Sequence, residues 1–229
     1  GTNDYLNAGK VLNLNSSFTV SSWIKRNSTN QTILSKRDNA FSTGYDLSIN
    51  STGKAEMSWV NGTKQTITST ATIPSGIWHN IAVTYNGTTA RLYIDGVLDV
   101  TQPMSTVPAN NQSFLIAAAD GVNTTSYFNG GIDEVRVWNV ALTDNQLRYV
   151  MNQEILKNGL VTNGSVIPNT IPLNEISAIP WANLSVYYPM STYTYTNTKD
   201  ISNNNYTAAL RNLTTVDRQT APLPYESAS

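Results

Sequence analysis

Alternation of apolar and polar residues dominates the first two thirds of the chain. In Phe18–Ile24 and Tyr45–Ile49 apolar and polar side chains largely alternate, which is the period of a half-buried strand. The pairs Asn61-Gly62 and Asp95-Gly96 separate further runs of this kind and are typical of two-residue hairpin turns. The other predicted strands are Ile33–Ser35, Ala55–Val60, Gln65–Ala71, Ile77–Tyr85, Ala90–Ile94, Val97–Val100 and Ser113–Ala118. About ten short strands joined by turns predict an all-β antiparallel fold, and a two-sheet jelly-roll sandwich fits the length better than a barrel.

The helical signal comes late and is short. It follows Ile132–Trp138, a run that itself has the pattern of a strand. Thr143 and Gln146 have the spacing of a capping box. The apolar positions that follow lie on one helical face, at Leu147, Val150 and Met151. We therefore expect one helix over about 142–154 that packs against the sandwich.

The last part of the chain has a different character. Residues 159–180 contain three prolines and no clear period, so we expect a surface linker there. Strand patterns return over 181–215, and the proline-containing segment 216–229 is interpreted as a tail or a further linker. Residues 1–158 are expected to form the main domain.

Composition excludes several functions. Charged residues make up only 13% of the chain and the net charge is −1, so there is no electrostatic basis for binding nucleic acid. No apolar run is long enough to predict membrane insertion. The chain has no cysteine, which excludes disulfides, thiolate metal sites and a cysteine nucleophile. A cysteine-free chain rich in Asn and Thr suits an extracellular, secreted or cell-surface location, with any targeting segment upstream of Gly1.

Catalytic patterns are weak. The single histidine, His79, lies inside a predicted strand and is interpreted as a structural residue. Glycoside hydrolysis needs two carboxylates on either side of the scissile bond. The adjacent acids Asp133 and Glu134 are expected to point to opposite faces of their strand, and the other glutamates are scattered. We therefore expect no enzymatic activity.

Three segments in this order resemble a known family. They read FTVSSWIK, WHNIAVTYNGTTARLYIDG and FNGGIDEVRVWNVAL, at Phe18–Lys25, Trp78–Gly96 and Phe128–Leu142. The resemblance is to the laminin G-like, concanavalin A-like lectin and glucanase jelly roll, in its bacterial, pentraxin-related branch. It covers roughly Gly1 to Ile155. It implies two stacked antiparallel sheets, one of them concave, with loops along one edge.

The chain departs from this family at its beginning. The usual opening strand and its Asp- and Asn-rich turn are missing, but similar sequences occur at Tyr187–Met190 and Asp200–Asn205. Residues 181–215 therefore either fold back to complete the same sandwich, as in a circular permutation, or begin a second repeat. Fold-back is favoured, because a strand pair alone is marginally stable and missing strands leave an open sheet edge.

The resemblance also implies two candidate calcium sites. One would use Asp38 and Asn39, as in the pentraxin loop, with Asp120. The other would use Asp133, completed by Asp4 or, after fold-back, by Asp200. Calcium prefers oxygen ligands of these types. The alternative for each residue is a surface carboxylate or amide that bonds its own loop.

A lectin site would combine an aromatic platform with amides and carboxylates. The candidate platforms are Tyr45, Trp59, Tyr127 and Phe128, beside Asp38, Asn39 and Asp120. Trp23, Trp78 and Trp138 lie in apolar alternation and are expected in the core.

These observations predict a non-catalytic extracellular recognition module, glycan-binding or adhesive, that is a monomeric part of a larger bacterial secreted or cell-surface protein. The alternative is a structural spacer without a ligand. A glycoside hydrolase is the least favoured interpretation.

Overall fold

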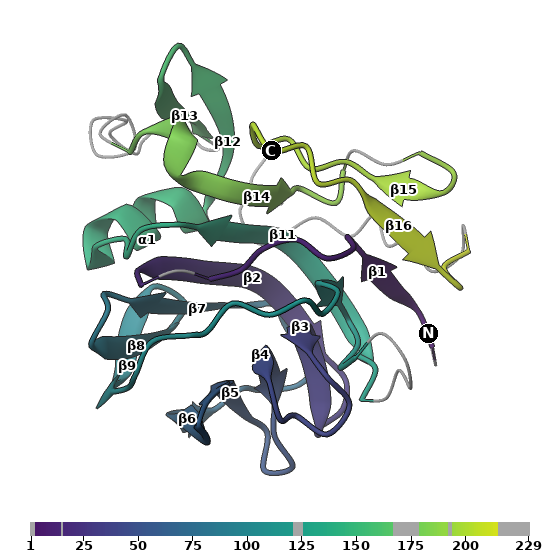
Figure 1. Ribbon diagram of the computed structural model, residues 1–229. Helices are drawn as coiled ribbons and strands as arrows, with labels where there is room; N and C mark the ends of the chain where they lie inside the picture. The colour runs from purple at the N-terminus through teal and green to yellow at the C-terminus, as the bar shows by residue number, and fades with distance from the viewer. Residues whose placement is uncertain (1–2, 15, 121–125, 167–178, 192–193, 215–229) are drawn as a thin grey trace.

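The computed structural model describes residues 3–14, 16–120, 126–166, 179–191 and 194–214. Within them, two large antiparallel sheets face each other across one core, as predicted for a jelly-roll sandwich (Figure 1). The eight-stranded sheet has the order β15 (Asn197–Thr198), β16 (Ala208–Arg211), β1 (Tyr5–Asn7), β10 (Leu115–Ile116), β3 (Gln31–Arg37), β4 (Gly44–Ile49), β5 (Lys54–Asn61) and β6 (Thr63–Thr72). The six-stranded sheet has the order β14 (Leu184–Tyr188), β11 (Gly130–Trp138), β2 (Phe18–Arg26), β7 (His79–Tyr85), β8 (Thr89–Ile94) and β9 (Val97–Pro103).

Both predicted hairpins are confirmed, but only the second has a two-residue turn. Strands β5 and β6 pair up to Asn61 and Thr63, around Gly62. Strands β8 and β9 meet at Asp95-Gly96, whose φ angles of 51° and 73° are the left-handed pair that a type I′ turn needs. Strand β7 begins at His79, two residues after the predicted start, and the skipped Ile77 is 54% exposed.

An aromatic cluster lies at the centre of the core. Phe18 from β2, Trp59 from β5 and Tyr85 from β7 have ring centroids 5.4–5.9 Å apart. The two polar ring atoms still find partners, because Trp59 Nε1 donates to Ser105 O at 2.8 Å and Tyr85 Oη donates to Met104 O at 3.0 Å. Burial of large aromatic side chains from both sheets joins the two layers.

The predicted helix is present but shorter. Helix α1 spans Asp144–Met151, and the capping box between Thr143 and Gln146 is confirmed. The prediction of helix to 154 was wrong, because β12 (Gln153–Asn158) begins immediately after it and pairs with β13 (Val161–Val166). The last carbonyls of α1 accept side-chain bonds instead of continuing the helix, from Arg136 to Val150 O and from Trp23 Nε1 to Met151 O.

A second, smaller core lies on the outer side of the six-stranded sheet. It joins Leu147 and Val150 of α1 to Trp138 of β11 and to Trp181 of the short 3-10 helix η1 (Trp181–Asn183). Trp138 is fully buried there, but Trp23 and Trp78 pack with each other apart from both larger cores. This core holds α1 against the sheet.

The C-terminal strands lie in the same two sheets as the rest of the chain. Strand β14 pairs with β11, and β16 pairs with β1, so β11 is an interior strand (Figure 1). The expected linker over 159–180 is wrong in part, because 161–166 form β13. The remainder of that linker, 167–178, and the tail 216–229 lie outside the described residues. The domain boundaries and the circular permutation stay predictions.

Candidate functional site

The outer side of the eight-stranded sheet carries the candidate site. In β4, Tyr45, Leu47 and Ile49 pack into the core, so alternation directs the residues between them outward. The same holds in β5 and β6, where Ala55, Met57 and Ile67 point inward. We call the outward polar side chains of β3–β6 the open face. They are Arg37, Asp46, Ser48, Glu56, Ser58, Lys64, Thr66 and Thr68.

Strand register arranges the open face in rows. Asp46 lies opposite Ser58, which lies opposite Thr66, and the hydroxyl oxygens of Ser58 and Thr66 are 2.8 Å apart. In the next row Glu56 lies between Ser48 and Thr68. Glu56 Oε1 accepts hydrogen bonds from Asn50 Nδ2 at 2.7 Å and Thr68 Oγ1 at 3.1 Å. The rows run across three strands, in which Asp46 and Ser58 are buried and the remaining members are partly exposed, namely Ser48, Glu56, Thr66 and Thr68.

An ion pair lies at one side of these rows. Arg37 Nε donates to Asp46 Oδ2 at 2.9 Å, and both side chains are largely buried. Burial raises the pKa of Asp46 to about 6, although Arg37 and Lys64 act in the opposite direction. A carboxyl group with a shifted pKa on an otherwise polar surface is a feature of functional sites.

The loop after β3 folds over this ion pair. Phe41 has φ 49°, and its ring centroid is 4.6 Å from Arg37 Cζ and 4.5 Å from Lys64 Nζ. The carboxylate of Asp38 shapes the loop by accepting bonds from Ser42 N at 2.8 Å and Thr43 N at 3.1 Å. The loop thereby places an aromatic ring and two cations beside the hydroxyl rows.

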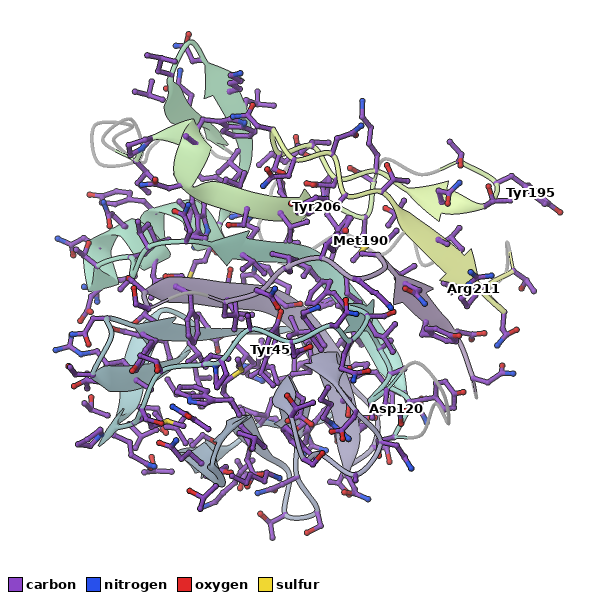
Figure 2. All side chains as sticks on the ribbon, in the orientation of Figure 1. Tyr45, Asp120, Met190, Tyr195, Tyr206 and Arg211 are labelled. Atoms are coloured by element: carbon purple, nitrogen blue, oxygen red, sulfur yellow. The ribbon has the colours of Figure 1, made fainter. Side chains whose placement is uncertain are left out.

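Tyr127, a predicted platform, lies at the other end of the same sheet. Its ring is 6.2 Å from that of Tyr5, at 45°, and both residues are partly exposed. Tyr5 is the β-pairing partner of the exposed Arg211. Figure 2 shows Arg211 and Tyr195 at the edge formed by β15 and β16.

The other three predicted platforms are core residues, so this part of the prediction is corrected. Phe128 is 4% exposed and packs in the main core. Tyr45 is 1% exposed and lies between the sheets, where its hydroxyl donates to Leu12 O at 2.8 Å (Figure 2). Trp59 is fully buried in the aromatic cluster. The alternation was recognised correctly, but these rings are on its inward side.

The residues of the first predicted calcium set lie near different parts of β3. Asp38 and the exposed Asn39 follow the end of this strand. Asp120 follows β10, which lies beside the middle of β3. There, Ala117 N donates to Ile33 O at 2.8 Å. Asp120 itself is buried, on the side of the molecule away from α1 (Figure 2).

The second predicted calcium set contains a carboxylate with a clear structural role. Buried Asp200 accepts hydrogen bonds at both oxygens, from the backbone N–H groups of Tyr187, Ser202 and Tyr206 at 2.8–2.9 Å. Asp133 Oδ1 accepts from Glu134 N at 2.8 Å, and Asp4 precedes β1. Within the described ranges no group of three or more His, Asp or Glu side chains is arranged to hold an ion. Calcium at either set stays a prediction.

Strand β11 is irregular where Asp133 and Glu134 lie, and the expectation that the two acids point to opposite faces stays a prediction. The pairing of β11 with β2 is irregular between Asp133 and Arg136, and Glu134 has φ 52°. Glu134 is buried, bonded to Arg136 and to Tyr187 Oη, the latter at 2.7 Å. Burial raises the pKa of this carboxyl group despite the adjacent guanidinium. The bulge therefore places Glu134 in a structural network under α1.

His79 also has a structural partner. Its Nδ1 lies 2.8 Å from Asp95 Oδ2, and Asp95 Oδ1 accepts from Asn80 N at 2.8 Å. The Asp95 carboxylate thus ties the start of β7 to the turn between β8 and β9.

The fold is a two-sheet jelly roll, and the chain belongs to the concanavalin A-like lectin/glucanases superfamily, whose sequence profile matches residues 1–148. No curated protein sequence matches the chain. None of the described helices is both long and apolar enough to cross a membrane.

Three solved structures share the fold. A candidate carbohydrate-binding protein from Bacteroides ovatus has a TM-score of 0.64 at 22% identity, over 93% of this chain and 57% of that one. The SAP-like pentraxin of Limulus polyphemus has a TM-score of 0.50 at 20% identity, over 64% of this chain and 75% of that one. The CBM40 of Ruminococcus gnavus IT-sialidase bound to sialyllactose has a TM-score of 0.52 at 19% identity, over 60% of this chain and 83% of that one.

Proposed function

We propose that the protein is a non-catalytic glycan-binding module and that its ligand lies across the open face. The observation that carries this proposal is the row of cross-strand hydroxyl and carboxylate groups over which the described residues place no helix. A polysaccharide presents hydroxyl groups at a regular repeat, and strands about 4.8 Å apart present partners at a regular repeat as well. Phe41 supplies an apolar surface at the side of these rows.

The structural relatives support this choice of ligand class. The Ruminococcus gnavus CBM40 is bound to sialyllactose, and domain 4 of the Geobacillus stearothermophilus arabinanase AbnA is in complex with arabinotriose. The latter has a TM-score of 0.51 at 21% identity, over 62% of this chain and 68% of that one. Two domains of one fold, each in complex with a different sugar, make glycan binding the leading function for this chain.

The state of the carboxylates supports a non-catalytic role. A glycosidase needs one carboxylic acid and one carboxylate that both reach the substrate. Asp46 is held by Arg37 with 8% of its side chain exposed, and Glu134 is sealed against Arg136. Glu56 is engaged by Asn50 and Thr68.

The wider setting is part of the same proposal. A bacterial secreted or cell-surface protein, in which this chain is a monomeric adhesive or accessory module, would give such a face access to external glycans. The chain spans 57% of the Bacteroides ovatus relative, which leaves room for further domains in a protein of that kind. Calcium at Asp38 and Asn39 would strengthen the loop that carries Phe41 beside the face.

A glycan array with matched variants tests this proposal. Glu56→Ala and Lys64→Ala remove polar groups from the open face. Glu154→Ala and Lys157→Ala make the same changes on β12, which lies at the opposite end of the molecule (Figure 1). Charged hydrogen bonds contribute about 1.5–3 kcal/mol, so we expect each open-face variant to bind its glycan at least about tenfold more weakly.

The control variants are expected to bind like the parent protein. Absence of binding to any arrayed glycan, with and without calcium, would favour a structural spacer. Equal losses in both variant pairs would contradict the placement of the site.

A further inference from the structure

A cleft of about 250 Å³ lies on the outer side of the six-stranded sheet, far from the open face. It is formed where the β7–β8 turn meets the segment that leads into α1. Its walls are Thr84, Asn86, Thr89, Arg91, Tyr93, Ala141, Leu142, Thr143 and Asp144. Tyr93 and Leu142 belong to the second core, so the cleft is separated from the open face by the whole sandwich.

Three polar side chains meet in this cleft. Tyr93 Oη donates to Asp144 Oδ1 at 2.8 Å, and Arg91 Nη1 lies 3.7 Å from the same oxygen. The body of Tyr93 is buried at 1% exposure, but the side chains of Arg91 and Asp144 are 48% and 42% exposed. The buried tyrosine thus fixes the carboxylate, and the arginine keeps most of its donors available to a ligand.

The chemistry of the lining selects among ligands. Arg91 and Asp144 balance each other in charge, so neither a free anion nor a cation is favoured. Thr89 adds a partly exposed hydroxyl group, and Ala141 adds a small apolar surface, while Thr84 and Leu142 are buried beneath them. A guanidinium, a carboxylate and hydroxyls around a small apolar patch suit vicinal hydroxyl groups on a carbon ring.

The size of the cleft sets a limit on the ligand. Pockets for drug-sized molecules have volumes of about 300–1,000 Å³, and this cleft is smaller. It suits one sugar residue. The helix N-terminus is not needed for recognition, since Thr143 already caps the N–H group of Gln146.

We propose that this cleft binds one neutral sugar residue, as a second site on the opposite sheet from the open face. The ring would place its carbon–hydrogen face against the partly exposed Ala141, while Arg91 donates to one hydroxyl group and Asp144 accepts from its neighbour. The site does not depend on the open face, so the protein would hold two glycan segments on opposite sides. A two-sided module can link separate chains and gain avidity.

The test is an NMR titration of the intact chain with millimolar D-glucose, D-galactose and D-mannose, and with sodium sulfate as an anion probe. We expect at least one sugar to shift the amide signals of Thr89, Arg91 and Asp144, and sulfate to leave them unchanged. Arg91→Met removes the guanidinium, and Thr89→Val removes a hydroxyl group without changing shape. We expect at least about tenfold weaker binding in Arg91→Met, since it loses a charged hydrogen bond.

Two controls separate this site from the open face. Lys64→Met changes the open face and should leave the cleft titration unchanged, whatever the glycan array shows. Lys157→Met removes an exposed cation from the β12–β13 hairpin and should also leave the cleft titration unchanged. A dispersed amide spectrum confirms that each variant is folded. The proposal is overturned if no sugar shifts the cleft amides, if sulfate shifts them equally, or if Arg91→Met and Thr89→Val both bind as the parent does.

Discussion

The two outer faces of the sandwich differ in what covers them. On the six-stranded sheet, α1 and η1 bury Trp138, Leu147 and Trp181 in a second core. On the eight-stranded sheet, the described residues leave Ser48, Thr66 and other polar side chains of β4–β6 partly exposed. On the six-stranded sheet α1 and η1 cover part of the face, and on the eight-stranded sheet the described residues place no helix over β4–β6.

The same contrast appears in two arginine–carboxylate pairs. Arg136 and Glu134 are both sealed under α1, and Arg136 also donates to the backbone of Val150 and Gln153. Arg37 and Asp46 lie under the single ring of Phe41, at the side of the open face. The comparison indicates that the first pair fixes the covering elements, and that the second can respond to a ligand or to pH.

The largest expected effect is on the covered face. Arg136→Met leaves Glu134 as a buried unpaired charge and removes donors from two backbone carbonyls. We expect a loss of about 3–5 kcal/mol in the free energy of unfolding, measured by urea denaturation. Lys64→Met on the open face should change it by no more than about 0.5 kcal/mol. Similar losses in the two variants would remove the distinction between the faces.

Calcium bound beside the open face would stabilise the folded protein and add to the difference between the two faces. A ligand at one hundred times its dissociation constant stabilises the folded state by about 2.7 kcal/mol. We therefore expect a chelator to lower the Tm and excess calcium to restore it. Asp38→Asn and Asp133→Asn should show which predicted set is responsible, because one of them should no longer respond. A Tm that is identical with and without chelator would rule out both sets.

Protonation of Asp46 is expected to have a smaller effect on the free energy of unfolding, and this effect depends on pH. Its folded pKa of about 6 is raised by burial, so the folded state binds the proton more tightly than the unfolded state. The stabilisation that comes from protonating Asp46 is complete below the pKa of the unfolded state and is lost as the pH rises through about 6. From pH 7 to pH 4, the parent protein should gain about 2 kcal/mol of stability relative to Asp46→Asn. Parallel stability curves for the two proteins would contradict the raised pKa.

Much of the fold follows from local pattern. The strand alternation, the turns at Asn61-Gly62 and Asp95-Gly96 and the capping box at Thr143 are each set by a few neighbouring residues. The end of α1 was harder to predict, because it depends on Arg136 and Trp23, which are distant in sequence and bond its last carbonyls. The β12–β13 hairpin was missed because its second strand lies in the segment interpreted as a linker.

The candidate site was harder to predict than the fold. Period-two alternation separates two faces but does not say which one meets the other sheet, so Tyr45 and Trp59 were placed on the wrong side. The polar residues at the alternate positions of the same strands, such as Asp46, Glu56 and Lys64, would have identified the open face. The position of Glu134 depends on a bulge in the pairing with β2, and the neighbouring residues do not predict this bulge.

The central claim is that glycans bind to the open face. Its most direct measurement is an NMR titration with the strongest glycan from the array, followed at every assigned backbone amide. We expect the largest shifts in β3–β6 and the loop that carries Phe41, with loss of these shifts in Glu56→Ala and Lys64→Ala. Shifts confined to α1 and β11, or no saturable shift with any glycan, would contradict the account.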